Sequence, residues 1–299
     1  MLSRQEVRNL RGGGRLLRCA RCGHLELADW PVRPEADEYA GVDPDSYRRS
    51  MWPERQASAA LLVRDLMRTG AQGPLLDVGC SFGWLLRAAG EAGFEAFGID
   101  PSESAVAAAR SSGLAVRQGL FPQQDWGRSD WEVITFLDVL EHIPDLDGVL
   151  GAAATRLKPG GFLAVQVPLS TGTVFLAAQA AESFSGGRVD GPLRRMLQVE
   201  FPYPHVHYFS RRSLEALLAR FGLETVLTSE GPIATGNLTD RVSWSEKVTV
   251  AHRIQALGLG LLVGVGRLLG RNDLLRLVAR RKDTSRPGAS AGDSGFRRL

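Results

Sequence analysis

A glycine-rich turn at the end of a short apolar stretch constrains the fold of this chain most strongly. Residues 74–78 are typical of a buried strand, the turn runs from Gly79 to Gly83, and a helical pattern over 82–92 follows. Glycine lacks a side chain and adopts left-handed backbone angles, so the turn lets the backbone approach a ligand at the start of a helix. Open α/β sheets bind their ligands at this position. Taken alone, the turn is also consistent with a tight connection that binds nothing.

Strands and helices alternate along most of the chain. After the first strand, the pattern predicts strands over 95–100, 115–119, 131–137, 162–167, 223–228 and 273–280, and helices over 54–68, 101–112, 146–157 and 210–221. Ser102 and Ser210 are expected to cap two of these helices. Such alternation produces right-handed βαβ units with helices on both faces of a sheet. The predicted fold class is therefore α/β, a Rossmann-like doubly wound, mostly parallel sheet.

Three regions interrupt the alternation. Residues 1–55 form an N-terminal extension, and residues 169–204 and 230–270 are predicted insertions in a domain that spans 56–282. The extension and the insertions are expected to cap the carboxyl ends of the strands, because loops there can vary without disturbing the sheet. Residues 283–299, rich in Ser, Gly, Ala and Arg, are predicted to be a disordered tail.

The interrupting regions carry more local predictions. The proline-rich residues 31–53 are expected to be an extended linker, in which Tyr39 and Tyr47 fold over a bound ligand or only anchor the chain. The first insertion is predicted to be helical around 174–182. The second contains an apolar helical face that is expected to pack on the domain, with a membrane surface or an apolar substrate as the alternatives. This face consists of Ile254, Leu257, Leu261, Val265 and Leu268.

Composition limits the partners. The net charge is +3, and arginines spread along the whole chain, which argues against a dedicated nucleic-acid surface. The longest apolar run, 256–266, is shorter than the roughly 20 residues that span a bilayer, so we expect no stable membrane insertion. The low number of cysteines, three, fits a reducing, cytoplasmic environment better than a disulfide framework.

Cys19, Cys22 and nearby His24 fall short of the four ligands of a closed zinc site, so we expect no metal. The sequence leaves the oligomeric state open.

Two carboxylates narrow the choice of ligand. Asp100 ends the second strand, where a carboxylate can accept hydrogen bonds from both hydroxyls of a ribose. This position suits both NAD and S-adenosylmethionine. The glycine pattern Gly79-x-x-x-Gly83 differs from the Gly-x-Gly-x-x-Gly turn of dinucleotide binders. Asp77 precedes the glycines, where it would repel a pyrophosphate and attract the ammonium group of a methionine moiety. S-adenosyl-L-methionine is therefore the predicted cofactor.

Four stretches together resemble the class I S-adenosylmethionine-dependent methyltransferases. They are 76–83 (LDVGCSFG), 98–102 (GIDPS), 138–145 (DVLEHIPD) and 157–163 (LKPGGFL). Residues 207–210 (HYFS) and 221–223 (FGL) are similar to segments of one subgroup of these enzymes. This subgroup contains the methyltransferases of ubiquinone biosynthesis and relatives from bacterial secondary-metabolite and glycan gene clusters. Residues 18–23 (RCARCG) are similar to the zinc ribbon that opens many of these relatives, although the first cysteine pair is missing, so a degenerate ribbon is expected.

The resemblance implies a fold and a set of site residues. The sheet order should be 3-2-1-4-5-7-6, with the last strand antiparallel. The reaction should be methyl transfer to an oxygen, nitrogen or carbon atom of a small-molecule acceptor, which the sequence does not identify. The implied cofactor contacts are Asp77, Gly79, Cys80 and Gly83 for the methionine part, Asp100 for the ribose, Leu120 for the adenine, and Leu137 and Asp138 beside the transferred methyl group.

Histidines supply the candidate catalytic groups. His142 follows the fourth strand, and an unperturbed histidine titrates near neutrality, so it is the first candidate general base. The alternative is that Glu141 and His142 only stabilise a turn. His205 and His207 would share one side of an extended segment. They would line the acceptor pocket, bind a metal with a third ligand, or merely precede a helix.

Three other classes of function compete with an active methyltransferase. An oxidoreductase would bind NAD, which the glycine pattern disfavours. A binding module with an emptied methyltransferase fold would have lost the cofactor turn, yet Asp77, Gly79, Gly83 and Asp100 are all present. A zinc-ribbon nucleic-acid binder would need four metal ligands and a basic patch.

Overall fold

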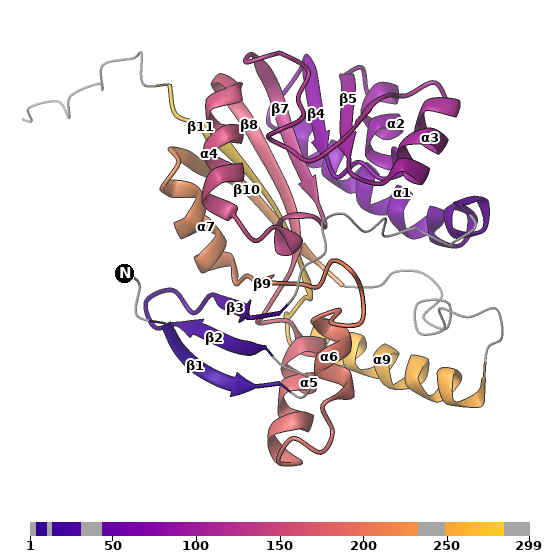
Figure 1. Cartoon of the computed structure of the whole chain (residues 1–299), viewed down its shortest axis with the longest axis vertical. Helices are drawn as coiled ribbons and strands as arrows, with labels where there is room; N and C mark the ends of the chain where they lie inside the picture. The colour runs from indigo at the N-terminus through magenta and orange to yellow at the C-terminus, as the bar shows by residue number, and fades with distance from the viewer. Residues whose placement is uncertain (1–3, 11–13, 31–43, 233–248, 284–299) are drawn as a thin grey trace, which may run out of the picture.

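The computed structural model describes residues 4–10, 14–30, 44–232 and 249–283 (Figure 1). A seven-stranded sheet forms the centre, in the order β10-β11-β8-β7-β4-β5-β6. Its strands are β4 (Pro74–Val78), β5 (Glu95–Asp100), β6 (Ala115–Gln118), β7 (Trp131–Leu137), β8 (Leu157–Pro168), β10 (Leu223–Gly231) and β11 (Leu274–Arg281). β4 to β8 pair in parallel, and β11 is antiparallel to both of its neighbours. The predicted strand order and antiparallel last strand are confirmed.

Helices cover both faces of this sheet. They are α1 (Pro44–Arg68), α2 (Trp84–Glu91), α3 (Glu103–Ser111), α4 (Leu146–Arg156) and α7 (Arg211–Ala219). The alternation of side chains along β7 explains the two layers, because Ile134 and Phe136 join the core under α4 and α7, whereas Val133 joins the core under α1 and α2. β7 is buried on both faces and is mostly apolar, with Glu132 and Thr135 as its buried polar residues.

The helix boundaries agree with the sequence prediction except at α1. Ser102 caps α3 and Ser210 caps α7, as predicted. α1 begins at Pro44, so the prediction that residues 44–53 belong to an extended linker was wrong. Proline is tolerated in the first turn of a helix, where its missing N–H has no partner to lose. Pro53 lies farther along, within the helix. The remainder of the predicted linker, with Tyr39, lies outside the described residues, as do the side chain of Tyr47 and the tail after residue 283.

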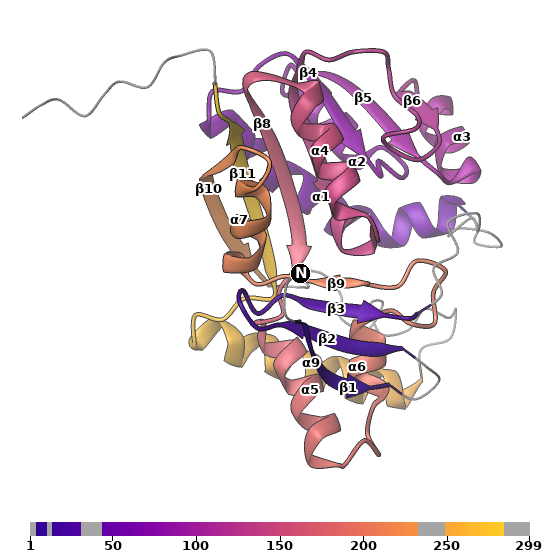
Figure 2. The same cartoon turned by 60° about the vertical axis from the view of Figure 1, so that its left-hand side comes forward.

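A second sheet lies beyond the carboxyl ends of the central strands (Figures 1 and 2). It is antiparallel and contains β1 (Arg4–Asn9), β2 (Arg15–Cys19), β3 (Leu25–Ala28) and β9 (His207–Tyr208). The sequence analysis did not predict β1 to β3. Leu16, Leu25 and Leu27 of this sheet share a core with Phe175 of α5 (Thr173–Phe184) and Leu193 of α6 (Gly191–Met196). The N-terminal extension and the first insertion therefore pack together as one cap.

α9 (Val250–Leu268) completes the described part of the cap, and it corrects one prediction. Its buried face carries Val263, which packs with Val174 of α5. The predicted core face (Ile254, Leu257, Leu261, Val265 and Leu268) is instead exposed to solvent. The helix is apolar on two sides. The periodicity correctly identified an apolar face, but that face is exposed to solvent and the opposite face packs on the domain. Among the described residues, no helix is long and apolar enough to cross a membrane.

Candidate functional site

The glycine turn after β4 has the backbone geometry that the sequence predicted. Gly79 and Gly83 have φ angles of 74° and 80°, and Ser81 between them has a φ of 48°. A Cβ on Gly79 would lie 2.4 Å from Val139, and one on Gly83 would lie 2.2 Å from Leu114. Such distances leave no room for a side chain, so both positions require glycine. α2 starts directly after the turn, at Trp84.

Asp100 ties this turn to the next helix. It is buried at the end of β5, and its two carboxylate oxygens accept hydrogen bonds from the backbone N–H groups of Ser81 at 2.7 Å and Ser102 at 2.9 Å. Each carboxylate oxygen has two lone pairs, so these two bonds by themselves do not saturate the carboxylate. Asp100 therefore fixes the turn, and its contact with a ribose stays a prediction.

The side chains of Asp77 and Cys80 are almost completely buried. Thr135 Oγ1 of β7 donates a hydrogen bond of 2.6 Å to the Asp77 carboxylate. Burial raises the pKa of Asp77 to about 7, the Thr135 hydrogen bond opposes this, and the charge of Asp100 adds to it. Burial also raises the pKa of the Cys80 thiol well above its usual value, so Cys80 stays protonated and is no nucleophile.

The loop after β7 brings together residues from three elements. Asp138 has a φ of 55°, and its backbone N–H bonds to the carbonyl oxygen of Gln166 on β8. Its carboxylate accepts a hydrogen bond of 2.9 Å from the Gln166 side-chain amide and forms an ion pair of 2.5 Å with Arg55 of α1. Leu137, the last residue of β7, is half-buried beside it. These groups surround the point where the sequence analysis expected the methyl group to be transferred.

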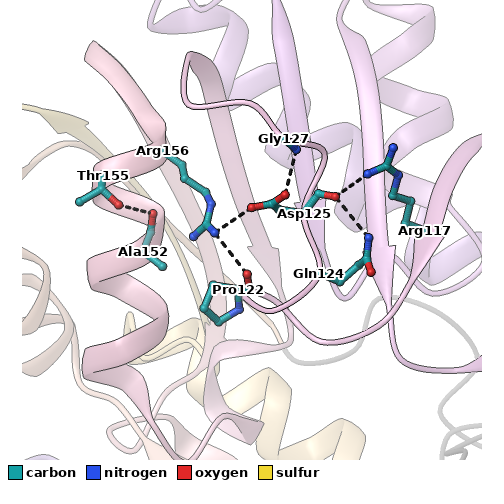
Figure 3. Close-up of polar contacts among 8 residues, drawn as sticks. All are labelled: Arg117, Pro122, Gln124, Asp125, Gly127, Ala152, Thr155 and Arg156. Carbon is teal, nitrogen blue, oxygen red and sulfur yellow. Dashed lines mark hydrogen bonds and ion pairs between the residues drawn. The ribbon is translucent and has the colours of Figure 1, made fainter.

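The loop after β6, which carries the predicted adenine neighbour Leu120, is held from both sides (Figure 3). Arg156 of α4 donates to the Asp125 carboxylate at 2.8 Å and to the Pro122 carbonyl oxygen at 3.2 Å. Arg117 of β6 donates to the Asp125 carbonyl oxygen at 2.6 Å. Leu120 itself is 45% exposed, and its contact with the adenine stays a prediction. Two arginines thus fix the loop while leaving its start accessible.

His142 lies in a short 3-10 helix, η1 (Leu140–His142), against the cap. Its Nδ1 lies 2.8 Å from the carbonyl oxygen of Tyr203, so Nδ1 carries the proton and Nε2 carries the lone pair. Burial lowers the pKa of His142, and the bonds to backbone carbonyl oxygens oppose this. The imidazole is therefore neutral at pH 7, the state that a general base requires.

Glu141 and His205 lie next to His142. The rings of His142 and His205 are 4.6 Å apart, and ligand-type atoms of all three side chains lie within 4.8 Å of one another. Burial, and then the charge of Asp138, raise the pKa of Glu141 well above its usual value, and Glu141 Oε2 has no hydrogen-bond partner among the residues that the structure describes. Among the described residues, this is the one group of three or more such side chains close enough to hold a metal ion.

The other histidines and cysteines occupy a different part of the cap. His207 Nδ1 lies 3.0 Å from His24 Nε2, so His205 and His207 have different partners despite their period-two spacing. Cys19 and Cys22 are free thiols at the turn between β2 and β3. Backbone N–H groups, that of Cys22 foremost, lower the pKa of Cys19, whereas burial raises the pKa of Cys22.

Sequence reasoning missed several residues of this site. Arg55, Thr135 and Gln166 contact the predicted acids but lie in segments that read only as helix or strand. Arg156 lies on a helix remote in sequence from the loop that it holds. No local motif marks any of them, because their roles arise from the pairing of β4, β7 and β8.

Known proteins resemble this chain in sequence and fold. The profile of the family described as "Methyltransferase domain" matches residues 51–228. The ubiquinone biosynthesis O-methyltransferase of Thiobacillus denitrificans is 38% identical over 96 residues, which cover 30% of this chain and 41% of that protein. The enzyme of the same name from Paramagnetospirillum magneticum is 38% identical over 114 residues, 36% of this chain and 46% of that protein. The matches span less than half the length of these relatives.

Two solved structures share the fold at low sequence identity. A putative sarcosine dimethylglycine methyltransferase from Galdieria sulphuraria has a TM-score of 0.51 and 17% identity, and the match covers 80% of this chain and 87% of that one. A possible histamine N-methyltransferase from Thermotoga maritima has a TM-score of 0.52 and 16% identity, over 80% and 95% of the two chains. The family profile matches more than half of the chain and includes the glycine turn, Asp100 and the loop after β7. The chain therefore belongs to the methyltransferase-domain family of class I S-adenosylmethionine-dependent methyltransferases.

Proposed function

We propose that this protein transfers the methyl group of S-adenosylmethionine to a small-molecule acceptor, and that the acceptor atom is a hydroxyl oxygen. The observation that carries the proposal is the joint geometry of Asp100, the turn Gly79–Gly83 and a neutral His142. The relatives that are named O-methyltransferases support the choice of oxygen. Nitrogen and carbon acceptors remain outcomes of the acceptor screen described below.

The residues fit the cofactor in shape and charge. Gly79 and Gly83 pack against the side chains of Val139 and Leu114, so a Cβ at either position would displace the turn against which the ligand would lie. Asp100 would hold the ribose hydroxyls, and Leu120 would lie against the adenine. Asp77, with Gly79, Cys80 and Gly83, would border the methionine moiety, whose ammonium group favours the charged form of a nearby carboxylate. Leu137 and Asp138 would border the sulfonium, and Arg55, which forms an ion pair with Asp138, would meet the cofactor carboxylate.

The chemistry needs alignment more than activation. S-adenosylmethionine supplies an already activated methyl group on a cationic sulfur, which the acceptor displaces in line. The protein has to orient the acceptor and exclude water. Here His142 Nε2 would accept the hydroxyl proton as the oxygen–carbon bond forms, while the Tyr203 carbonyl holds the other ring nitrogen. The cap of β1 to β3, α5, α6 and α9 would bind the acceptor, because it covers the carboxyl ends of the strands (Figure 1).

Calorimetric titration with S-adenosylhomocysteine and NAD tests the cofactor assignment. Asp100→Asn should weaken binding of S-adenosylhomocysteine by about tenfold to a hundredfold, the cost of losing hydrogen bonds to a charged acceptor. Asp145→Asn is the matched control, because Asp145 caps α4 by a bond to the Gly148 N–H, away from the turn. Melting curves identify any loss of folding. If the protein binds NAD and does not bind S-adenosylhomocysteine, the proposal is refuted.

An acceptor screen tests the base. Purified protein is incubated with S-adenosylmethionine and a library of phenols, sugars, amines and activated methylenes, and S-adenosylhomocysteine release is measured. His142→Gln should lower the turnover of a hydroxyl acceptor by about a hundredfold to ten-thousandfold and leave the affinity for S-adenosylhomocysteine unchanged. Equal turnover by wild type and variant would exclude His142 as the base. Activity with amines only would refute the assignment to oxygen.

A further inference from the structure

The outer face of α9 is a continuous apolar stripe with no covering among the described residues. Its members recur every three or four residues along the whole helix and are 47% to 88% exposed: Val250, Ile254, Leu257, Leu261, Val265 and Leu268. This spacing places them on one side of the helix. A monomeric protein rarely leaves so large a contiguous apolar surface in water, so the stripe indicates a contact surface.

The opposite face of α9 shows that the stripe is not needed for packing. Val263 and Ala256 are buried, and Val263 meets Val174 of α5 in a small core. At Gly266, a Cβ would lie 2.7 Å from Thr173 Oγ1, so the helix is seated closely on the start of α5. The helix is thus fixed by one face and presents the other. In Figure 1, α9 lies at the margin of the cap, away from the central sheet.

The charges within α9 and the turn that follows it have one sign, and Glu230 of β10 is the acid that lies near Arg271. Residues 249–272 contain no aspartate or glutamate. Arg253, Arg267 and Arg271 are exposed, and none of them forms an ion pair with any residue that the structure describes. Arg253 and Arg267 each directly precede a stripe residue, so at about 100° per residue they lie on the same flank. On the other flank, the exposed Arg195 of α6 donates a hydrogen bond to Gln255 at 3.5 Å.

This charge pattern distinguishes between two possible occupants. In an antiparallel pair of α9 helices from two copies, Arg253 of one helix would lie beside Arg267 of the other, since both are seven residues from Gly260 at the centre. Like charges would meet, and neither helix supplies an acid to compensate them. An anionic lipid surface offers both an apolar layer for the stripe and negative headgroups for the flanking arginines.

We propose that α9 docks the protein on an anionic lipid surface, with the helix lying in the plane of the headgroups and its stripe in the acyl boundary. The length of the stripe, the exposed arginines and the absence of acids together match an interfacial helix. The rest of the chain stays on the aqueous side. The cap, and with it the acceptor side of the molecule, would then face the lipid.

Co-sedimentation of the full chain with extruded vesicles tests this proposal. Vesicles of phosphatidylglycerol mixed with phosphatidylcholine should bind the protein, and vesicles of phosphatidylcholine alone should bind it weakly. Binding should weaken as salt is added. Leu257→Gln/Leu261→Gln should lower the partition coefficient by about tenfold or more, because two leucines no longer enter the acyl boundary. Arg253→Gln/Arg267→Gln should lower it by about fivefold for each arginine.

Matched controls distinguish docking through α9 from non-specific adsorption to vesicles and from misfolding. Met67→Gln/Val226→Gln replaces two exposed apolar residues on α1 and β10, outside the stripe, and this variant should bind vesicles as the wild type does. Melting curves check each variant, and the arginine variant keeps the apolar stripe if the leucine variant fails to fold. Equal vesicle binding by wild type and both α9 variants would overturn the proposal. A concentration-dependent dimer that Leu257→Gln/Leu261→Gln abolishes, without vesicle binding, would overturn it in favour of a second copy.

Discussion

Asp77→Asn should make this protein more stable at alkaline pH, even though it alters the cofactor site. Asp77 is buried with a single described hydrogen bond, from Thr135, and its pKa in the folded protein is about 7, against 3.8 for an unperturbed aspartate. The folded state therefore keeps its proton over a pH range in which the unfolded chain has lost it. By linkage, wild-type stability falls as the pH rises from about 4 to about 7 and then levels off.

The size of the effect follows from the two pKa values. One pKa unit corresponds to about 1.36 kcal/mol, so the full cost of ionising the buried carboxylate is about 4 kcal/mol above pH 7. At pH 5 about 1.7 kcal/mol of that cost is already present, which leaves about 2 to 3 kcal/mol to develop between pH 5 and pH 8. Asparagine does not titrate, and its carbonyl oxygen still accepts the hydrogen bond from Thr135.

Urea unfolding of wild type and Asp77→Asn at pH 5 and pH 8 measures this quantity. The stability difference between the two proteins should shift in favour of the variant by about 2 to 3 kcal/mol from the lower to the higher pH. Other titrating groups cancel, because they are present in both proteins. A shift smaller than about 0.5 kcal/mol, or one of opposite sign, would show that Asp77 ionises normally in the folded protein and would refute the account of its burial.

Three further changes test the surroundings of the site. Gly98→Ala would place a Cβ 2.5 Å from the Cys80 sulfur and should lower stability by about 1 to 3 kcal/mol, with partial recovery in the double variant Gly98→Ala/Cys80→Ala, as measured by urea unfolding. Arg276→Met removes the 3.2 Å ion pair of the buried Asp65, which keeps Arg68 at 3.8 Å and the Ser229 hydroxyl at 2.7 Å, and should lower stability by about 2 to 4 kcal/mol in urea unfolding; a cost below about 1 kcal/mol would contradict this. Arg156→Gln should weaken S-adenosylhomocysteine binding by about twofold to tenfold in calorimetry, because the loop after β6 loses a charge-assisted hydrogen bond; unchanged affinity would show that this loop does not border the adenine.

The central sheet was predictable because its determinants are local. Runs such as β7 are apolar on both faces, and Ser102 and Ser210 mark helix starts by bonds to residues three positions away. The strand order came from the resemblance to a family, since alternation alone does not order strands. Local sequence patterns therefore predicted the strands and helices, and the four motifs shared with the family predicted the order of the strands in the sheet.

The cap was less predictable because its determinants are non-local. Leu16 and Leu25 become buried only when they meet α5 and α6, which come more than a hundred residues later in the chain. The apolar stripe of α9 was assigned to the core because a helical period reports a face but not what covers it. Arg55 escaped notice for the same reason, because its partner Asp138 belongs to a distant loop.

The cap also controls the chemistry that the sheet alone cannot define. The carbonyl oxygens that fix the His142 tautomer belong to Tyr203 and Pro204 of the first insertion, and the Val206 N–H bonds back to the Glu141 carbonyl oxygen. Asp100 accepts hydrogen bonds from the backbone N–H groups of Ser81 and Ser102, which lie outside the insertion. On the proposed function, cofactor binding would depend on the sheet and its turns, whereas the protonation pattern of the candidate base would depend on the cap. A change in the insertion would then alter the acceptor and its activation together, while the methyl donor remains the same.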